Sequence, residues 1–344
     1  MNSERITNRQ AFFLLFLFYL GNLITAVGAK GSQSAWLLLL ILAALSIPVL
    51  YLYEKATMGN PGGAVFIRPF GKTAGGILTV LYGLLAIMMA GDAIRAFADF
   101  LVINDLNNAG AFGNSALLSV CALFLLYCSA RSLGRSAWIL FLPVVMLLGA
   151  SLLFSIKDFQ MQRLMPLFGE GRTVLFNNLT AGFAAGTAPA FFPIAALSGS
   201  APKKWNRALF AAGITATMLL ALLSLRDTAV LGASMVSMFR FPSFVAAATH
   251  RHSEVLLSAA FVLIQPFRAA LCLRYAQECL LYWKPSLQRW YPPVLLSLAA
   301  FSSILSWSSQ QVRWRTTGSL IVSFFLLAGP LTVVLKDYWD KRRS

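Results

Sequence analysis

Ten apolar segments divide this sequence, and they constrain its fold more than any other feature. A helix that crosses a bilayer needs roughly 20 apolar residues. The segments are 11–29, 35–53, 74–103, 115–130, 136–156, 173–198, 207–225, 255–275, 291–311 and 316–335. Only 12% of the residues are charged, whereas soluble domains average about 25%. The sequence therefore predicts an all-α membrane protein with about ten transmembrane helices, built as one polytopic domain over residues 1–344.

The stretch 228–253, between the seventh and eighth segments, does not fit this series. It is only moderately apolar and carries Arg240, Pro242 and His250. Charged side chains near the centre of a bilayer are costly. We expect a re-entrant or surface-lying piece here rather than a full span.

The distribution of basic residues predicts the orientation of the chain in the membrane. With the N-terminus on the cytoplasmic side, 17 Lys and Arg residues fall in inner loops and tails and 8 fall in outer ones. Cytoplasmic loops are enriched in Lys and Arg. Both termini are therefore expected in the cytoplasm, which also requires an even number of spans.

Residues that support catalysis or bind metals are scarce. The only histidines are His250 and His252, and the four cysteines include no CxxC pair. The sequence therefore has few residues that could form a zinc site or act as a histidine acid or base. The net charge of +16 fits basic cytoplasmic loops, because no aromatic–basic nucleic-acid motif accompanies it. We expect no enzyme, no catalytic residue, no metal or other cofactor, and no nucleic-acid partner.

The first apolar segment changes character halfway. Phe12–Leu20 is almost wholly apolar, and Gly21, Asn22 and Thr25 then follow at membrane depth. Freed backbone groups in hydrocarbon cost several kcal/mol each, so a broken helix survives there only where it lines protein or a cavity. We interpret this break as half of a small-molecule site. The alternative is an ordinary helix that ends near Val27.

The sixth segment has a matching interruption. Small residues run from Ala181 to Ala188, and Pro189 and Pro193 follow. Proline removes a backbone donor and clashes with the preceding turn, and small residues let another backbone or a ligand approach. The alternative is a kinked helix with a small-residue packing seam, which is common in membrane bundles.

The two interruptions lie five spans apart. The second half of the chain, about 173–336, then enters the membrane upside down relative to the first half, about 10–156. Interrupted helices at matching positions of inverted halves indicate a binding site at the membrane midplane. We therefore add Gly186, Thr187 and Ala188 to the candidate ligand-binding residues.

Charged residues also occur inside two of the spans. Asp92, Arg95 and Asp99 share one face of the third segment, where Arg95 can pair with both acids, and Arg268 follows Pro266 in the eighth segment without an evident partner. One interpretation is a structural ion-pair network, and the other is a gate or a contact to a ligand carboxylate.

Taken together, several short motifs resemble those of one family. The order and spacing of these motifs match the permease-like B subunit of spore germinant receptors, within the amino acid–polyamine–organocation superfamily. They are Ile6–Thr7 with Gln10, Leu20–Gly21, Ala35–Trp36, Arg95 with Phe97 and Asp99, Leu164 with Pro166, Gly169 and Gly171, Gly186, Val230–Leu231–Gly232, and Phe241–Pro242–Ser243.

This resemblance implies a LeuT-like fold of five plus five helices in an inverted repeat. It also implies a small germinant, commonly an amino acid, held between broken helices 1 and 6, with helices 3 and 8 as walls. By the same analogy, Leu85 and Met89 join Gly21 and Gly186 in lining the pocket. The implied partners are A-type and C-type receptor subunits, and the implied location is the spore inner membrane.

Two functions follow from these observations. The first is a germinant-receptor subunit that binds a small molecule at the midplane and signals to partner subunits during spore germination. The alternative is a secondary amino-acid permease coupled to H⁺ or Na⁺, which needs an acidic residue beside the pocket. Asp92 is the only good candidate for that acid, and its pairing with Arg95 would compromise it.

Overall fold

The computed structural model describes residues 5–26, 33–58, 62–104, 110–165, 167, 171–202, 205–249, 253–305 and 311–343. Within these ranges every regular element is helical. The long helices are α1 (Asn8–Ala26), α2 (Ala35–Thr57), α3 (Ile67–Ile103), α4 (Gly110–Tyr127), α5 (Ala130–Phe154), α6 (Arg172–Gly182), α7 (Phe191–Ser198), α8 (Asn206–Leu231), α11 (Ser253–Trp283), α12 (Tyr291–Leu305) and α13 (Gln311–Arg343).

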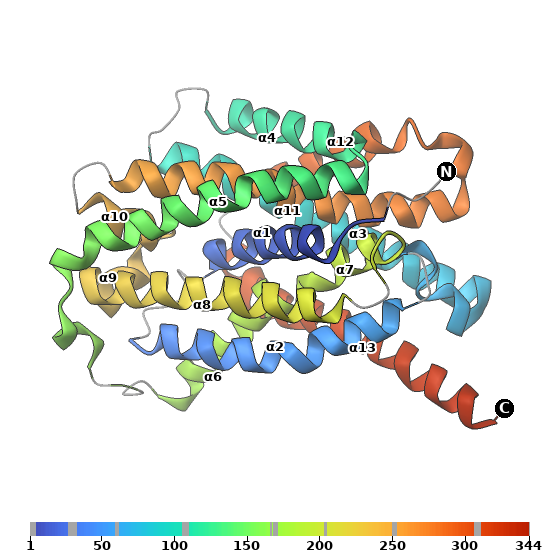
Figure 1. The fold of residues 1–344 in the computed structure, drawn as a ribbon, viewed down its shortest axis with the longest axis horizontal. Coiled ribbons are helices and arrows are strands. Elements are labelled where there is room, and N and C mark those ends of the chain that lie inside the picture. The colour runs from blue at the N-terminus through green and yellow to red at the C-terminus, as the bar shows by residue number, and fades with distance from the viewer. Residues whose placement is uncertain are drawn as a thin grey trace.

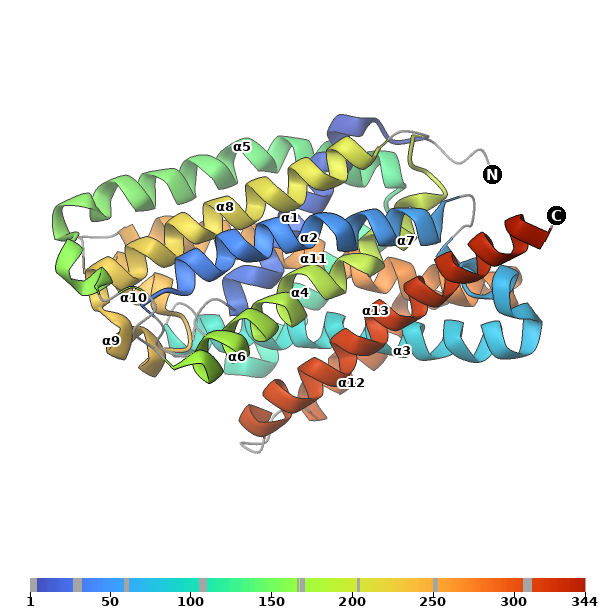
Figure 2. The ribbon, with the colours of Figure 1, turned by 90° about the horizontal axis from the view of Figure 1, so that it is seen from below.

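These helices confirm the all-α membrane fold. Among the described residues, 8 helices, counting α6 and α7 as one, are long and apolar enough to cross a membrane, and α12 is a shorter apolar helix. Most helices run along one common direction, and both termini lie at the same end of the bundle (Figures 1 and 2).

After α8, the described part of the stretch 228–253 contains only two short helices and no span, as the sequence predicts. Helix α8 ends at Leu231 because Gly232 adopts a φ of 82°, a left-handed conformation that favours glycine. The short helices α9 (Ala233–Met238) and α10 (Pro242–Ala248) follow and lie at the end of the bundle away from the termini (Figure 1).

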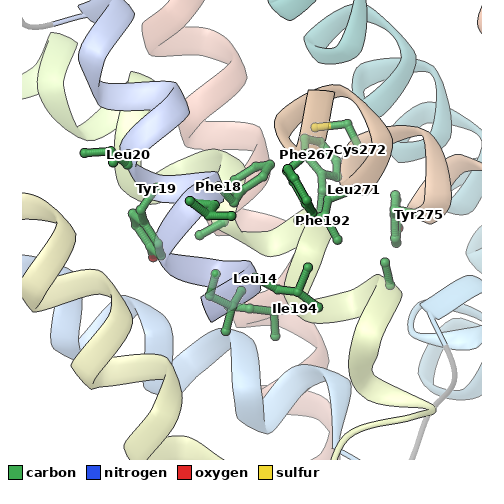
Figure 3. Close-up of a cluster of buried hydrophobic side chains, with 14 of the residues drawn as sticks. Leu14, Phe18, Tyr19, Leu20, Phe192, Ile194, Phe267, Leu271, Cys272 and Tyr275 are labelled. Atoms are coloured by element: carbon green, nitrogen blue, oxygen red, sulfur yellow. The ribbon is translucent and has the colours of Figure 1, made fainter. Parts of the chain in front are cut away.

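Helix α1 forms the centre of the bundle. It packs against α5, α8 and α11, and its Leu14, Leu17 and Leu20 are fully buried. A helix that is apolar on all sides is stable only when it is covered all round. Figure 3 shows side chains of α1, including Leu14 and Phe18, beside residues of α7 and α11 such as Phe192 and Leu271.

The predicted break in the sixth span is present. Helix α6 ends at Gly182, a π-helical turn covers Phe183–Thr187, a 3₁₀ turn covers Ala188–Ala190, and α7 begins at Phe191. Pro189 and Pro193 lack the N–H that a regular α-helix would use here, so the backbone departs from α-geometry.

The predicted break in the first span is wrong for the described residues. Helix α1 remains α-helical through Gly21, Asn22 and Thr25 and ends at Ala26. A Cβ on Gly21 would lie 2.9 Å from Cγ2 of Ile264 and 3.5 Å from Cβ of Arg268. The glycine therefore permits close packing of α1 on α11 rather than unwinding. Residues 27–32, which follow this helix, lie outside the described residues.

Candidate functional site

Helices α1, α3 and α11 meet next to the broken sixth span. Helix α11 packs along both α1 and α3, and α1 also contacts the π-helical turn Phe183–Thr187. The predicted site residues are carried by these four elements. Helix α11 thus brings together residues predicted on the first, third and eighth apolar segments, and α1 connects them to the sixth.

The contact between α1 and α11 is polar as well as close. The side-chain amide of Gln265 donates from Nε2 to the carbonyl oxygen of Gly21 at 3.3 Å. Gln265 is fully buried, and its Oε1 has no hydrogen-bond partner among the residues that the structure describes. Burial of an unsatisfied polar atom costs about 1–3 kcal/mol. Gln265 was not among the predicted site residues, although a glutamine next to Pro266 in an apolar span was an available signal.

An ion pair joins α3 to α11 beside this contact. Nη2 of Arg268 lies 2.6 Å from Oδ2 of Asp92. The Arg268 side chain is only 5% exposed, whereas that of Asp92 is 45% exposed. The structure thus supplies the partner that the sequence could not name for Arg268. The two opposite charges lie 176 residues apart in the chain.

A second ion-pair cluster lies toward the end of α3. Nε of Arg95 lies 2.7 Å from Oδ1 of Asp99, which confirms the predicted pairing of these two residues. Nη1 of Arg240 lies 2.6 Å from Oδ2 of the same carboxylate. Arg240 belongs to the segment between α9 and α10, so Asp99 connects that segment to α3.

Aromatic rings pack beside this cluster. The ring of Phe100 lies 4.2 Å from that of Phe261 and 5.1 Å from that of Phe241, between ring centroids. Phe244 of α10 also packs on Phe100, at 5.6 Å. These rings and the Asp99 cluster lie toward the end of the bundle that holds α9 and α10 (Figure 1).

A larger aromatic cluster lies on the other side of the Asp92–Arg268 pair along the bundle. Phe191, the first residue of α7, is fully buried and contacts most of its rings. The cluster, which we call the Phe191 cluster, comprises Tyr53, Phe66, Tyr82, Phe191, Phe192 and Tyr275. The hydroxyl group of Tyr53 donates to the carbonyl oxygen of Ala188 at 3.3 Å.

The ion pair lies midway between the two aromatic layers. At 1.5 Å per residue, Arg268 is about 10 Å along α11 from Phe261 and about 10 Å from Tyr275. On α3, Asp92 lies between Tyr82 and Phe100 in the same way. The polar centre of the bundle is therefore enclosed on both sides by aromatic rings.

The remaining predicted site residues surround this centre to different degrees. Leu85 and Met89 are half-buried and share a face of α3 with Asp92, because they precede it by seven and three residues. Asn22 is 2% exposed and Thr187 is 2% exposed. Gly186 and Ala188 are buried in the π-helical and 3₁₀ turns. The side chain of Thr25 lies outside the described residues.

Comparisons with known proteins agree with this architecture. The sequence profile of a family described as "Spore germination protein" matches residues 5–248. Spore germination protein KB of Bacillus subtilis (strain 168) is 26% identical over 154 residues, which make up 44% of this chain and 41% of that protein. The match thus spans about two fifths of the length of this relative.

A solved structure resembles nearly the whole chain. The crystal structure of MhsT in complex with L-phenylalanine superposes with a TM-score of 0.70 at 15% sequence identity, covering 96% of this chain and 89% of that one. At this identity the likeness concerns the fold, which is LeuT-like.

Proposed function

The chain belongs to the spore germination protein family, and from this premise we propose that it is the permease-like membrane subunit of a spore germinant receptor. It binds a small, amino-acid-like germinant at the midplane of the bundle. It then passes a conformational change to A-type and C-type receptor subunits in the spore inner membrane, with both termini in the cytoplasm. Spore germination protein KB and the family match support the germination role.

The observation that carries the ligand assignment is the ion pair of Asp92 and Arg268. Ionisable residues within membrane spans are costly and typically mark functional sites. This pair offers a carboxylate to a ligand ammonium group and a guanidinium to a ligand carboxylate, and the 45% exposure of Asp92 leaves one side accessible. An amino acid carries both complementary charges.

The broken sixth span supports the same assignment. Residues Gly186, Thr187 and Ala188 lie in π-helical and 3₁₀ turns, where the backbone departs from the α-helical hydrogen-bond pattern. Irregular backbone at membrane depth is tolerated where it faces protein or a cavity. In the proposed site, Leu85 and Met89 bound the apolar side, and Gly21, Asn22 and Thr25 belong to the α1 wall.

The alternative function is a secondary amino-acid permease coupled to H⁺ or Na⁺. The LeuT-like fold favours it, since the MhsT structure holds L-phenylalanine. The ion pair counts against it, however, because a carboxylate neutralised by Arg268 at 2.6 Å attracts a small coupling cation less than an unpaired one does. Gradient-driven uptake of labelled amino acids into proteoliposomes that contain only this chain would favour the permease.

The receptor role is tested in spores that carry the double variant Asp92→Asn, Arg268→Gln. This variant removes both charges while keeping two polar, similarly sized side chains, so we expect normal amounts in the membrane and no germination response. The matched control is Arg226→Gln, Asp227→Asn, which neutralises a buried ion pair elsewhere, with 2.7 Å between Nη2 and Oδ1. The control should be present in the membrane and should germinate normally. A normal germination response of the Asp92→Asn, Arg268→Gln variant beside such a control would show that the ligand assignment is wrong.

A further inference from the structure

A groove runs along the lipid-facing side of α3 near its beginning. Its volume is 560 Å³, within the range of about 300–1,000 Å³ typical of small-molecule sites. Its lining is apolar except at one end, where a lysine and a threonine lie. The lining residues are Gly76, Ile77, Val80 and Leu81 of α3, Trp283 at the end of α11, and Lys72 with Thr73 at the polar end.

Glycines shape this groove. Gly71 has a φ of 76° and interrupts the helical geometry of α3, so the chain changes direction directly before Lys72. A Cβ on Gly76 would lie 2.7 Å from the ring of Trp283. The indole can therefore rest against the backbone of α3, and together they form two walls of a concave surface.

Two of its lining residues indicate that the groove faces the lipid. Ile77 is 60% exposed and Val80 is 50% exposed, and both belong to a helix long and apolar enough to cross a membrane. The beginning of α3 lies at the end of the bundle that holds both termini (Figure 2), which is the cytoplasmic end in the orientation proposed above. Trp283 ends its span there, as aromatic residues at membrane interfaces do.

One lysine lines the polar end of the groove, and two further basic residues lie close to it in the chain or in space. Lys72 is exposed at the polar end, and Arg68, four residues earlier on the other side of the bend at Gly71, is also exposed. Nζ of Lys336, from α13, lies 5.3 Å from the ring centroid of Phe70. The groove lining contains no acidic residue. An apolar slot with a lysine at its end complements an acyl chain attached to an anionic headgroup.

We propose that this groove binds one anionic phospholipid of the inner leaflet. One acyl chain lies along Ile77, Val80 and Leu81 against the indole of Trp283, and the headgroup phosphate pairs with Lys72. This site is separate from the germinant site, and its assignment does not depend on the receptor role. It gives the protein a specific lipid ligand in addition to the bilayer around it.

The test is native mass spectrometry of the purified full-length chain in detergent, titrated with phosphatidylglycerol and, separately, with phosphatidylethanolamine. We expect one retained phosphatidylglycerol and weaker retention of phosphatidylethanolamine. Lys72→Gln should weaken phosphatidylglycerol binding about fivefold, the effect of one basic residue near an anionic membrane surface, and should leave phosphatidylethanolamine unchanged. Lys72 is exposed, so this variant should fold normally.

A second pair of variants tests the slot itself. Leu81→Trp fills the groove and should abolish stoichiometric retention. Leu84→Trp is the matched control, because Leu84 is 51% exposed on the same helix and does not line the groove. Equal retention by both tryptophan variants, or equal retention of the two lipids by the wild type, would overturn the proposal. So would copurification of a second copy of this chain that is lost only in Leu81→Trp, since the occupant would then be protein.

Discussion

The ion pair between α3 and α11 is asymmetric, and this asymmetry makes a quantitative prediction. The Arg268 side chain is 5% exposed and that of Asp92 is 45% exposed. Asp92→Asn leaves a buried guanidinium without its carboxylate, which typically costs about 3–5 kcal/mol. Arg268→Gln leaves a carboxylate whose side chain is 45% exposed, so its cost should be nearer the value of about 1 kcal/mol for exposed pairs.

The double variant Asp92→Asn, Arg268→Gln should recover most of this loss. Neutral polar side chains replace both charges, and replacing a whole buried pair is often close to neutral. The glutamine also keeps the Cβ of position 268, which packs against α1 next to Gly21. We therefore expect the order of stability to be wild type, double variant, Arg268→Gln and finally Asp92→Asn.

Thermal unfolding of the purified proteins in detergent measures this order. At about 2 °C per kcal/mol for a large chain, Asp92→Asn should lower the midpoint by about 6–10 °C and Arg268→Gln by about 2 °C. A larger loss in Arg268→Gln than in Asp92→Asn would refute the reasoning from exposure. A double variant as unstable as Asp92→Asn would show that the two charges do not act as a pair.

Three further substitutions test other contacts. Gly21→Leu should reduce stability and the amount of protein in the membrane, because a Cβ at this position would lie 2.9 Å from Ile264. Gly149→Leu is the control and should be tolerated, because nothing lies within 4 Å of a Cβ there. Comparable amounts of the two variants would contradict the close packing of α1 on α11. Arg240→Ala should lower the free energy of unfolding by about 1 kcal/mol or less, since this side chain is 35% exposed. It should nevertheless speed amide hydrogen exchange in α10. Unchanged exchange there would mean that the ion pair with Asp99 does not hold this segment. Tyr82→Phe removes the hydroxyl group that donates to the carbonyl oxygen of Phe325 at 2.5 Å. The free energy of unfolding should fall by about 1 kcal/mol. An unchanged thermal midpoint would show that this hydrogen bond does not stabilise the fold.

The order of the helices could be predicted from the sequence because span length and apolar composition are local properties. The segment 35–53, for example, corresponds to Ala35–Thr57, and 74–103 falls within Ile67–Ile103. The break in the sixth span was predictable for a similar reason. Proline imposes its effect on the backbone wherever it stands.

The first span shows where this reasoning fails. Glycine permits either an unwound backbone or a close helix contact, and only the neighbouring helix decides between them. At Gly21 the neighbour is α11, with Ile264 and Arg268 against it, and α1 stays helical. One sequence contains no information about that neighbour.

The charged residues illustrate the same limit. Spacing along a helix correctly predicted Arg95 with Asp99, which are four residues apart. It could not predict Asp92 with Arg268, because that pair joins two helices. Gln265 was missed for the same reason, since its bond to Gly21 spans 244 residues.

Equilibrium binding to the purified chain tests the ligand site most directly. Labelled amino acids would be titrated against the wild type and against Asp92→Asn, Arg268→Gln, each checked for an intact thermal transition. We predict saturable binding of at least one amino acid by the wild type and none by the folded double variant. Equal affinity of both proteins for the same amino acid would contradict a germinant site at the Asp92–Arg268 pair.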